Sequence, residues 1–193
     1  MTENVHRIIP LLFKALAFSA EKHTKQRRKD LDQSPYINHP IALANTLSQR
    51  GIVDENVLCA AILHDTIEDT DTTEEELTKE FGKKITSIVL EVTDDKSLEK
   101  SVRKQKQIEH AASISNEAKL VKLADKISNL TDIIKTPPSD WSLERKKEYF
   151  NWAKAVVNNL RGVHSALEKE FDSLVMTQEF ISALQQGIND ENS

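Results

Sequence analysis

Glycine and proline are the residues that most limit what this chain can fold into, because both are scarce. The 193 residues include 4 glycines and 5 prolines. A chain that reverses direction many times, as an all-β sandwich or barrel does, needs such residues at its turns. Ala, Leu, Glu, Lys and Gln are common, and all of them favour helices. The composition therefore predicts an all-α fold.

Apolar periodicity places the expected helices along the whole chain. Over residues 8–22, apolar side chains recur at helical spacing and form one face. Pro40 suits the first position of a second helix, which is expected to end near Gly51. The other expected helices cover residues 57–67, 74–82, 85–92, 101–112, 117–134, 141–170 with an interruption at Gly162, and 171–186. We expect a single bundle of roughly eight to ten helices.

No repeat, linker or shift in composition divides the chain into parts. We expect one domain over residues 1–188 and a disordered tail over 189–193. Cys59 is the single cysteine, so neither an internal disulfide nor a cysteine-rich zinc site can form. Residues 1–6 lack a signal-peptide pattern, and no apolar run approaches the ~20 residues that span a bilayer. These features predict a cytoplasmic protein without membrane contact.

The formal net charge of −5 argues mildly against a dedicated nucleic-acid-binding protein, which usually carries a basic face or a high pI. It leaves open a small anionic substrate, because local clusters of basic residues decide such binding. The last expected helix can pack on the core or on a partner, so the oligomeric state stays open.

Four ionisable side chains fall within residues 64–69, directly after a strongly apolar helix. A buried carboxylate needs a partner or a metal ion. Glu68 lies one turn beyond His64, and the two share a helix face if the helix continues. The pattern favours a metal site with an attached acid/base pair, in which Asp69 is the second carboxylate. The alternative interpretation is the solvated end of a helix, and this segment alone does not separate the two.

Two other segments offer candidate metal ligands. His39 stands at the start of a helix, where a capping or core histidine is the alternative. Asp125 borders the apolar stripe of the helix over 117–134, and an ion pair with a neighbouring lysine is its alternative. With His64 and Asp65, these residues would offer two nitrogens and two carboxylate oxygens to one divalent cation. That set suits Mn²⁺, Fe²⁺, Co²⁺ or Zn²⁺ better than Ca²⁺.

In these segments the sequence resembles the HD-domain superfamily of metal phosphohydrolases. It is more closely similar to the hydrolase domain of RelA/SpoT proteins, and closer still to the stand-alone small alarmone hydrolases, the group that includes the metazoan SpoT homologue. The resemblance spans residues 8–170 and rests on six segments in the family's order: 26–29, 35–40, 63–70, 91–96, 119–130 and 148–153.

The resemblance implies an all-α, single-domain HD bundle that holds one metal ion, usually Mn²⁺. The matching ligands are His39, His64, Asp65 and Asp125, and none is missing. The implied reaction removes the 3′-pyrophosphate from ppGpp or pppGpp and leaves GDP or GTP. Glu68 and Asp69 match the acid/base pair of that reaction. The chain is too short for the synthetase domain of the longer relatives, and residues 32–34 depart from them by lacking a glycine.

Basic residues are expected to meet the charged substrate. By resemblance, Arg28 and Lys29 flank the base, and an arginine is suited to stack on a purine. Lys100, Arg103 and Lys104 form a second basic cluster that suits phosphate groups. For each of these residues, a solvated surface charge is the alternative.

Three further residues complete the expected substrate site. Asn129, one turn beyond Asp125, is a candidate hydrogen-bond partner for the ribose or a phosphate. Arg145 and Tyr149 lie one turn apart on a long helix, and we expect them to close the pocket.

Other functions fit the same residues. An NADPH 2′-phosphatase or a ppApp hydrolase would use the same metal site, because each substrate presents phosphate on a ribose beside a purine. A non-catalytic nucleotide-sensing module is an alternative of another class, although such a protein would be expected to have lost a ligand or the Glu68–Asp69 pair. A cyclic-nucleotide or deoxynucleotide hydrolase is a further alternative, which the resemblance of 27–29 and 36–40 opposes.

Overall fold

A computed structural model describes the backbone over residues 2–30 and 32–191, and the side chains over 8–30, 32–179 and 181. Within these residues the fold is all-α, as predicted, and one isolated β-bridge joins Arg27 to Pro35. The described helices are α1 (Thr2–Lys22), α2 (Asn38–Gln49), α3 (Glu55–Leu63), α4 (Thr66–Asp69), α5 (Glu74–Val92), α6 (Lys100–His110), α7 (Asn116–Lys135), α8 (Leu143–Asn158) and α9 (Ser165–Glu191).

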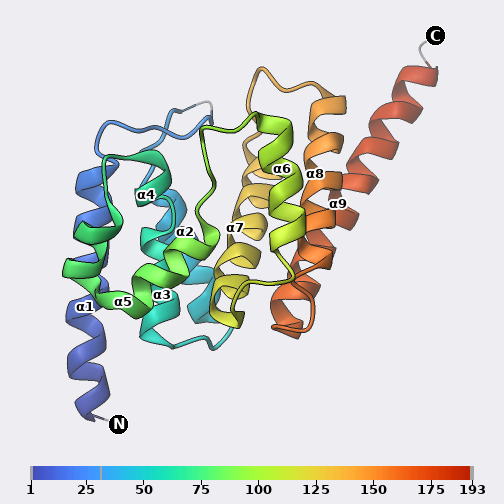
Figure 1. Cartoon of the computed structure of the whole chain (residues 1–193). Coiled ribbons are helices and arrows are strands. Elements are labelled where there is room, and N and C mark those ends of the chain that lie inside the picture. The colour runs from blue at the N-terminus through green and yellow to red at the C-terminus, as the bar shows by residue number, and fades with distance from the viewer. Residues whose placement is uncertain (1, 31, 192–193) are drawn as a thin grey trace.

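The helices form one bundle in which α3 and α7 are central (Figure 1). Helix α3 packs against α1, α2, α5 and α7, and α7 also packs against α8 and α9. Every residue of 57–63 in α3 is buried, as expected for a helix that is apolar on all sides. The Asp54 side chain caps its start by accepting hydrogen bonds from the backbone N–H groups of Asn56 and Val57.

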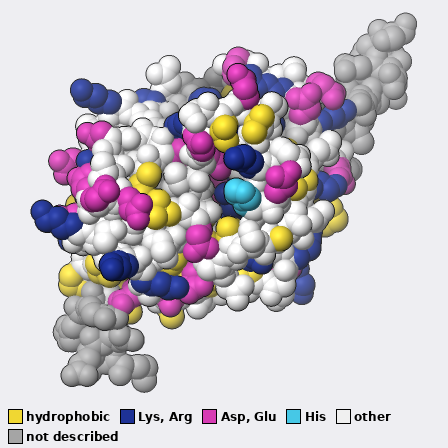
Figure 2. All heavy atoms as spheres, in the orientation of Figure 1, with side chains coloured by type: hydrophobic (Ala, Val, Ile, Leu, Met, Phe, Trp, Pro, Cys, Tyr) yellow, Lys and Arg dark blue, Asp and Glu magenta, His cyan; other side chains and the backbone are white. Residues whose placement is uncertain are grey.

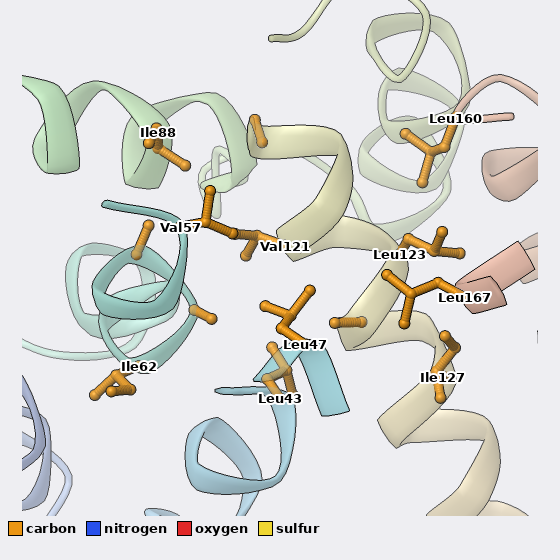
Figure 3. Packing of buried hydrophobic residues seen from close by; sticks show 14 of the residues in the cluster. Leu43, Leu47, Val57, Ile62, Ile88, Val121, Leu123, Ile127, Leu160 and Leu167 are labelled. Carbon is orange, nitrogen blue, oxygen red and sulfur yellow. The ribbon is translucent and has the colours of Figure 1, made fainter. Parts of the chain in front are cut away.

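The hydrophobic core lies between these two central helices and their neighbours. Figure 3 shows Leu43 and Leu47 of α2 facing Val121, Leu123 and other apolar residues of α7. The same core continues to Leu167 in α9, which is fully buried. This packing brings α2, α3 and α7 together; α2 and α7 carry His39 and Asp125, and His64 and Asp65 directly follow α3.

The expected helix over 57–67 is wrong in one respect that matters for the site. Helix α3 ends at Leu63, and α4 begins at Thr66. The Thr66 hydroxyl donates a hydrogen bond to the Leu63 carbonyl oxygen at 2.7 Å, and Thr66 is fully buried. Because the helix stops, Glu68 and His64 do not share the face of one continuous helix.

Two other boundaries show where glycine was informative. Gly82 has φ 82° and divides α5 at a kink, in agreement with the two helices expected over 74–82 and 85–92. Gly162 has φ 92° in the turn between α8 and α9, where an interruption was expected. The further boundary expected between residues 170 and 171 is wrong, because α9 continues through it and Phe171 is fully buried.

The ends of the chain extend the expected elements. Helix α1 begins at Thr2 instead of residue 8. Of the tail expected over 189–193, residues 189–191 belong to α9, and 192 and 193 lie outside the described residues. The domain limits 1–188 therefore stay a prediction.

The described surface agrees with the modest net charge of the chain. Figure 2 shows acidic and basic side chains interspersed over one face of the bundle, with hydrophobic side chains in small groups. Among the described helices, none is long and apolar enough to cross a membrane.

Candidate metal and nucleotide site

A polar cavity of about 210 Å³ lies where α2, α4 and α7 meet the break after α3. We call it the histidine hollow, because His39 and His64 line it. Its other charged lining residues are Arg28, Asp65, Glu68, Asp69, Asp94, Lys122, Asp125 and Lys126. All four candidate metal ligands and both candidate acid/base residues therefore reach one cavity.

His39 enters the hollow from the first turn of α2 and faces α7. Its Nε2 lies 3.2 Å from Asp125 Oδ1, and its Nδ1 lies 3.2 Å from the Ser128 hydroxyl. Burial lowers the pKa of His39, so the ring tends to stay neutral and can offer a nitrogen lone pair. Burial acts to raise the pKa of Asp125, but Lys126 and His39 outweigh it and hold that pKa well below its usual value.

His64 is positioned by the end of α3. Its Nδ1 lies 2.9 Å from the Ala61 carbonyl oxygen, which can only accept, so Nδ1 is the donor. Its Nε2 lies 2.8 Å from Asp65 Oδ2 but is buried without a hydrogen-bond partner. Burial acts to lower the pKa of His64, but the Asp65 carboxylate outweighs it and raises the pKa to about 9. Nε2 therefore faces a strongly negative environment.

The structure brings three of the four candidate ligands into one group. One potential ligand atom from each of His39, His64 and Asp125 lies within 4.8 Å of the others. Asp65 stands beside this group, where its Oδ2 also accepts a hydrogen bond from the Tyr36 hydroxyl. Imidazole nitrogens with a carboxylate oxygen suit a divalent transition metal. The unpartnered Nε2 of His64 is consistent with such an ion, so the residues present fit the group.

Glu68 and Asp69 are neighbours in α4 with different surroundings. Glu68 Oε2 accepts a hydrogen bond from the Asp94 backbone N–H at 3.0 Å, and its Oε1 lies 4.0 Å from the Arg103 guanidinium. Burial raises the pKa of Glu68 to about 7, although the Asp94 N–H opposes the shift. Asp69 accepts from Gln26 Nε2 at 2.7 Å and forms an ion pair with Lys96. Glu68 is therefore suited to exchange a proton near neutral pH.

Two further hollows adjoin the histidine hollow. The first, about 300 Å³, we call the aromatic hollow, because Tyr36, Trp141 and Tyr149 line it. The second, about 560 Å³, we call the basic hollow, and its cationic lining residues are Lys29, Lys100, Arg103, Lys104 and Arg145. Every residue predicted to bind the substrate lines at least one of the three hollows.

The three hollows share lining residues, so they adjoin one another. Arg28, Tyr36, Asp69 and Asn129 line both the histidine and the aromatic hollow. Glu68, Asp94 and Gln107 line both the histidine and the basic hollow. Lys29, Trp141 and Tyr149 line both the aromatic and the basic hollow.

Arg28 is held in place between the aromatic and histidine hollows. Its Nη2 donates to Asp132 Oδ2 at 2.5 Å and to Asn129 Oδ1 at 3.3 Å, and its guanidinium lies 5.8 Å from the centre of the Tyr36 ring. Asn129 Nδ2 in turn donates to Asp125 Oδ1 at 2.6 Å. Asn129 thus links the arginine to a candidate metal ligand.

The wall between the aromatic and basic hollows is built from aromatic rings. Trp141 and Tyr149 have ring centres 5.5 Å apart, and Tyr149 and Trp152 have theirs 5.2 Å apart. Arg145 lies 4.5 Å from the centre of the Trp141 ring, and Lys104 lies 5.2 Å from that of Trp152. Flat rings and cations in this arrangement suit a purine next to phosphate groups.

A family model described as HD domain matches residues 15–150. A protein of Xenopus tropicalis is 53% identical over 169 residues, which cover 87% of this chain and 94% of that protein. A protein of Homo sapiens is 51% identical over 164 residues, which cover 84% and 92% respectively. Both bear the name guanosine-3′,5′-bis(diphosphate) 3′-pyrophosphohydrolase MESH1. The chain belongs to the HD domain family and, within it, to the MESH1 family.

A solved structure supports the same membership of the MESH1 family. It is described as a metazoan orthologue of SpoT that hydrolyses ppGpp and plays a role in starvation responses. Its TM-score to this chain is 0.85 at 48% sequence identity, and the match covers 87% of this chain and 95% of that one. The resemblance identified from the sequence is thereby confirmed. The HD domain also implies a divalent metal ion, in keeping with the group of His39, His64 and Asp125.

Sequence reasoning missed several residues of this MESH1-family site. Tyr36 was recognised only as part of a matching segment, although its hydroxyl contacts Asp65. Asp132 lies one turn beyond Asn129 on α7, and that spacing could have indicated it. Trp141 was treated only as the start of a helix. Lys122 gave no signal, because a lysine inside an amphipathic helix is normally exposed.

Proposed function

We propose that this MESH1-family protein is a manganese-dependent hydrolase that removes the 3′-pyrophosphate from ppGpp and pppGpp and leaves GDP and GTP. The observation that carries the proposal is that the three hollows adjoin and share lining residues. The histidine hollow adjoins a basic hollow of a size and charge that suit pyrophosphate, and an aromatic hollow that suits a purine. The names and functions of the MESH1 relatives support the same reaction.

Four residues would hold the metal: His39, His64, Asp65 and Asp125. A bound divalent cation supplies Lewis-acid polarisation of a phosphoryl oxygen and makes water more acidic near neutral pH. Manganese is favoured because the donors combine imidazole with carboxylate, and because it accepts water at its open positions. The Ser128 hydroxyl contacts Nδ1 of His39 and the Ala61 carbonyl oxygen contacts Nδ1 of His64, and these contacts would hold the two rings with Nε2 toward the metal.

Glu68 would act on the attacking water. Its carboxylate lines the histidine hollow, and its pKa near 7 lets it take a proton as the water oxygen attacks the phosphorus joined to the ribose 3′-oxygen. The new oxygen–phosphorus bond forms while the bond from phosphorus to the 3′-oxygen breaks. The 3′-oxygen takes up a proton, and pyrophosphate leaves. Asp69, held by Gln26 and Lys96, would orient the water beside Glu68.

The cationic residues would bind the charged parts of the substrate. Lys100, Arg103 and Lys104 of α6 line the basic hollow and would meet the pyrophosphate. Arg28 and Lys29 would contact the base, with Arg28 oriented by Asp132. Asn129 would contact the ribose or a phosphate, and Arg145 and Tyr149 would close the pocket from α8. The lone cysteine, Cys59, suits a reducing compartment, and we place the activity in the cytoplasm.

Adenine substrates are a second candidate, and one observation favours them. Three aromatic rings and two guanidinium groups line the aromatic hollow, and stacking on such groups is available to every purine. The carboxylate of Asp132, which could distinguish guanine, is already bonded to Arg28. A ppApp hydrolase or an NADPH 2′-phosphatase would therefore use the same three hollows.

A product assay tests the proposed function. The purified protein is stripped with EDTA, supplied with Mn²⁺, and offered ppGpp, ppApp and NADPH in parallel. We expect pyrophosphate release from ppGpp that EDTA abolishes. Phosphate release from NADPH alone would replace ppGpp as the proposed substrate and would leave the proposed metal site unchanged. No turnover of any of the three would favour a nucleotide-sensing module and overturn the proposal.

A further inference from the structure

Lys122 of α7 is a buried lysine whose charge the rest of the site does not use. It is 7% exposed and lines the histidine hollow. Its Nζ donates one long hydrogen bond, at 3.4 Å, to the Val92 carbonyl oxygen. No carboxylate oxygen of the described residues lies within 4.0 Å of it. An ammonium group has three protons to donate, and a buried charge without a partner is unfavourable.

The next buried lysine on the same helix shows what a fully partnered charge looks like here. Lys126 is 4% exposed, and its Nζ lies 2.9 Å from Asp125 Oδ2. The same Nζ lies 4.5 Å from the centre of the Trp152 ring. Lys126 is therefore accounted for as the partner of a candidate metal ligand, and Lys122 has no equivalent.

Lys122 lines the histidine hollow next to the wall that this hollow shares with the basic hollow, which Glu68, Asp94 and Gln107 form. A small cavity of about 140 Å³ behind that wall is lined by Lys122 together with Asp94, Arg103 and Gln107. Asp94 and Gln107 also line both the histidine and the basic hollow. A group that passes from one hollow to the other must therefore pass this wall.

The residues around Lys122 include two buried polar atoms without a hydrogen-bond partner. They are Nε of Arg103 and Oε1 of Gln107. Buried polar atoms are normally hydrogen-bonded, so unpartnered atoms clustered around one residue indicate a place for a polar ligand. Two of the three residues, Arg103 and Lys122, are cations that can donate to an anionic ligand, and they lie beside the carboxylates of Glu68 and Asp94.

We propose that Lys122 is a further catalytic residue, whose ammonium group contacts the non-bridging oxygens of the pyrophosphoryl group under attack. This inference rests on the proposed function, because that reaction places a pyrophosphoryl group between the histidine and basic hollows. Water forms the new bond to phosphorus, the bond to the 3′-oxygen breaks, and the pyrophosphate keeps the contact with Lys122 until it leaves. Lys122 stays an ammonium throughout and transfers no proton.

Burial and the nearby Lys126 lower the pKa of Lys122 and outweigh the opposing effect of the Asp94, Asp125 and Glu68 carboxylates, so its charge is only partly compensated in the free protein. A bound pyrophosphoryl group would supply that compensation. Charge-stabilising groups of this kind contribute most when they are held in place before the reaction, away from bulk water.

The test compares Lys122→Met with Lys119→Met, which removes a lysine from the same helix but lines none of the hollows described above. Binding of inorganic pyrophosphate is measured by calorimetry with Mn²⁺ in excess, so this readout needs no turnover. We expect Lys122→Met to weaken pyrophosphate binding about 10- to 100-fold and to lower kcat for ppGpp by a similar factor. Lys119→Met should change both values less than about twofold.

Thermal stability and metal binding separate this role from a structural one. Replacing a buried, unpaired charge with an apolar side chain should leave Tm unchanged or raise it. Mn²⁺ affinity should not change. If Lys122→Met does not fold, Lys122→Gln takes its place with the same readouts. Pyrophosphate affinity within twofold of the parent, or loss of Mn²⁺ binding, would overturn the inference. If pyrophosphate binding depends on Lys122 but the parent does not hydrolyse ppGpp, only the proposed function fails.

Discussion

The histidine hollow and the basic hollow share a wall, but they are built in different ways. In the histidine hollow, the side chains of His39 and His64 are 2% and 6% exposed. Nδ1 of His39 lies beside the Ser128 hydroxyl, and Nδ1 of His64 lies beside the Ala61 carbonyl oxygen. In the basic hollow, the side chain of Arg145 is 42% exposed, and Lys100 is exposed as well. We infer that the first hollow supplies fixed geometry for bond cleavage, and the second supplies movable charge for recognition.

Removing a ligand from the histidine hollow should have the largest effect. We expect His64→Ala to lower kcat about 10³-fold or more, because loss of a ligand exceeds the ~10- to 100-fold effect of losing a residue that only orients one. Calorimetry with Mn²⁺ and steady-state kinetics measure the two consequences. Normal turnover by this variant would contradict this comparison, because the reaction would then not take place in the histidine hollow.

Glu68→Gln should separate chemistry from metal binding within the same hollow. The amide keeps the size of the side chain but cannot take a proton, so we expect kcat to fall about 10²- to 10⁴-fold. Mn²⁺ affinity should stay the same, because Glu68 is not among the grouped ligands. An unchanged kcat would remove Glu68 from the mechanism.

Arg28→Ala tests a residue that lies between the histidine hollow and the aromatic hollow. Arg28 is held by Asp132 and Asn129 but faces the aromatic hollow, so we expect mainly a raised KM, about tenfold, with kcat little changed. Kinetics with ppGpp over a range of concentrations give both constants. A fall in kcat at constant KM would assign Arg28 to the reacting centre instead.

Lys104→Ala should show the smaller effect expected of a movable charge. One long-range phosphate contact in partly exposed surroundings supports a rise in KM of about two- to fivefold. The effect should shrink as salt is raised from low to physiological concentration, because exposed charges are screened. A salt-independent effect of tenfold or more would show that the basic hollow is as fixed as the histidine hollow.

The pH dependence of stability tests the burial of Glu68 in the histidine hollow and needs no substrate. Burial raises the pKa of Glu68 from 4.5 to about 7 in the folded protein, so the folded state binds this proton more tightly than the unfolded state. Glu68 therefore destabilises the fold increasingly as pH rises from 4.5 to 7, and by a constant amount above 7.

Melting curves of the EDTA-treated protein from pH 5 to pH 8 test this effect. Glu68→Gln should gain a few degrees of Tm over the parent across that window, with no further gain above pH 7. A Tm difference that does not change with pH would show that Glu68 is not buried as described. Lys104→Ala, in the basic hollow, serves as the matched variant and should show no such trend.

Sequence patterns predicted the helices well where a residue type marks a boundary. Gly82 and Gly162 stand at real interruptions. The break between α3 and α4 was not predictable in the same way. Residues 64–67 contain no glycine or proline, and the break depends on a Thr66 hydroxyl bonded to the Leu63 carbonyl inside the core.

For the candidate site too, the sequence predicted local features but not contacts between elements. The local sequence identified His64, Asp65, Glu68 and Asp69 as chemically unusual, because so many ionisable groups follow an apolar helix. It could not show that Asp69 is paired with Lys96, nor that Glu68 faces Asp94 and Arg103, because these partners lie on other elements. Lys122 escaped notice for the same reason, since its burial depends on what packs over α7.

Taken by itself, the sequence determined the helical class of the fold and the presence of every side chain that the proposed reaction requires. Helix formation is local, and the identity of a side chain does not depend on its surroundings. Only the tertiary structure decided which of these side chains meet. Packing of α2, α3 and α7 around one core places His39, His64 and Asp125 within 4.8 Å of one another. Burial, which depends on the whole fold, then sets the pKa of Glu68 and leaves Lys122 with one long hydrogen bond to the Val92 carbonyl oxygen.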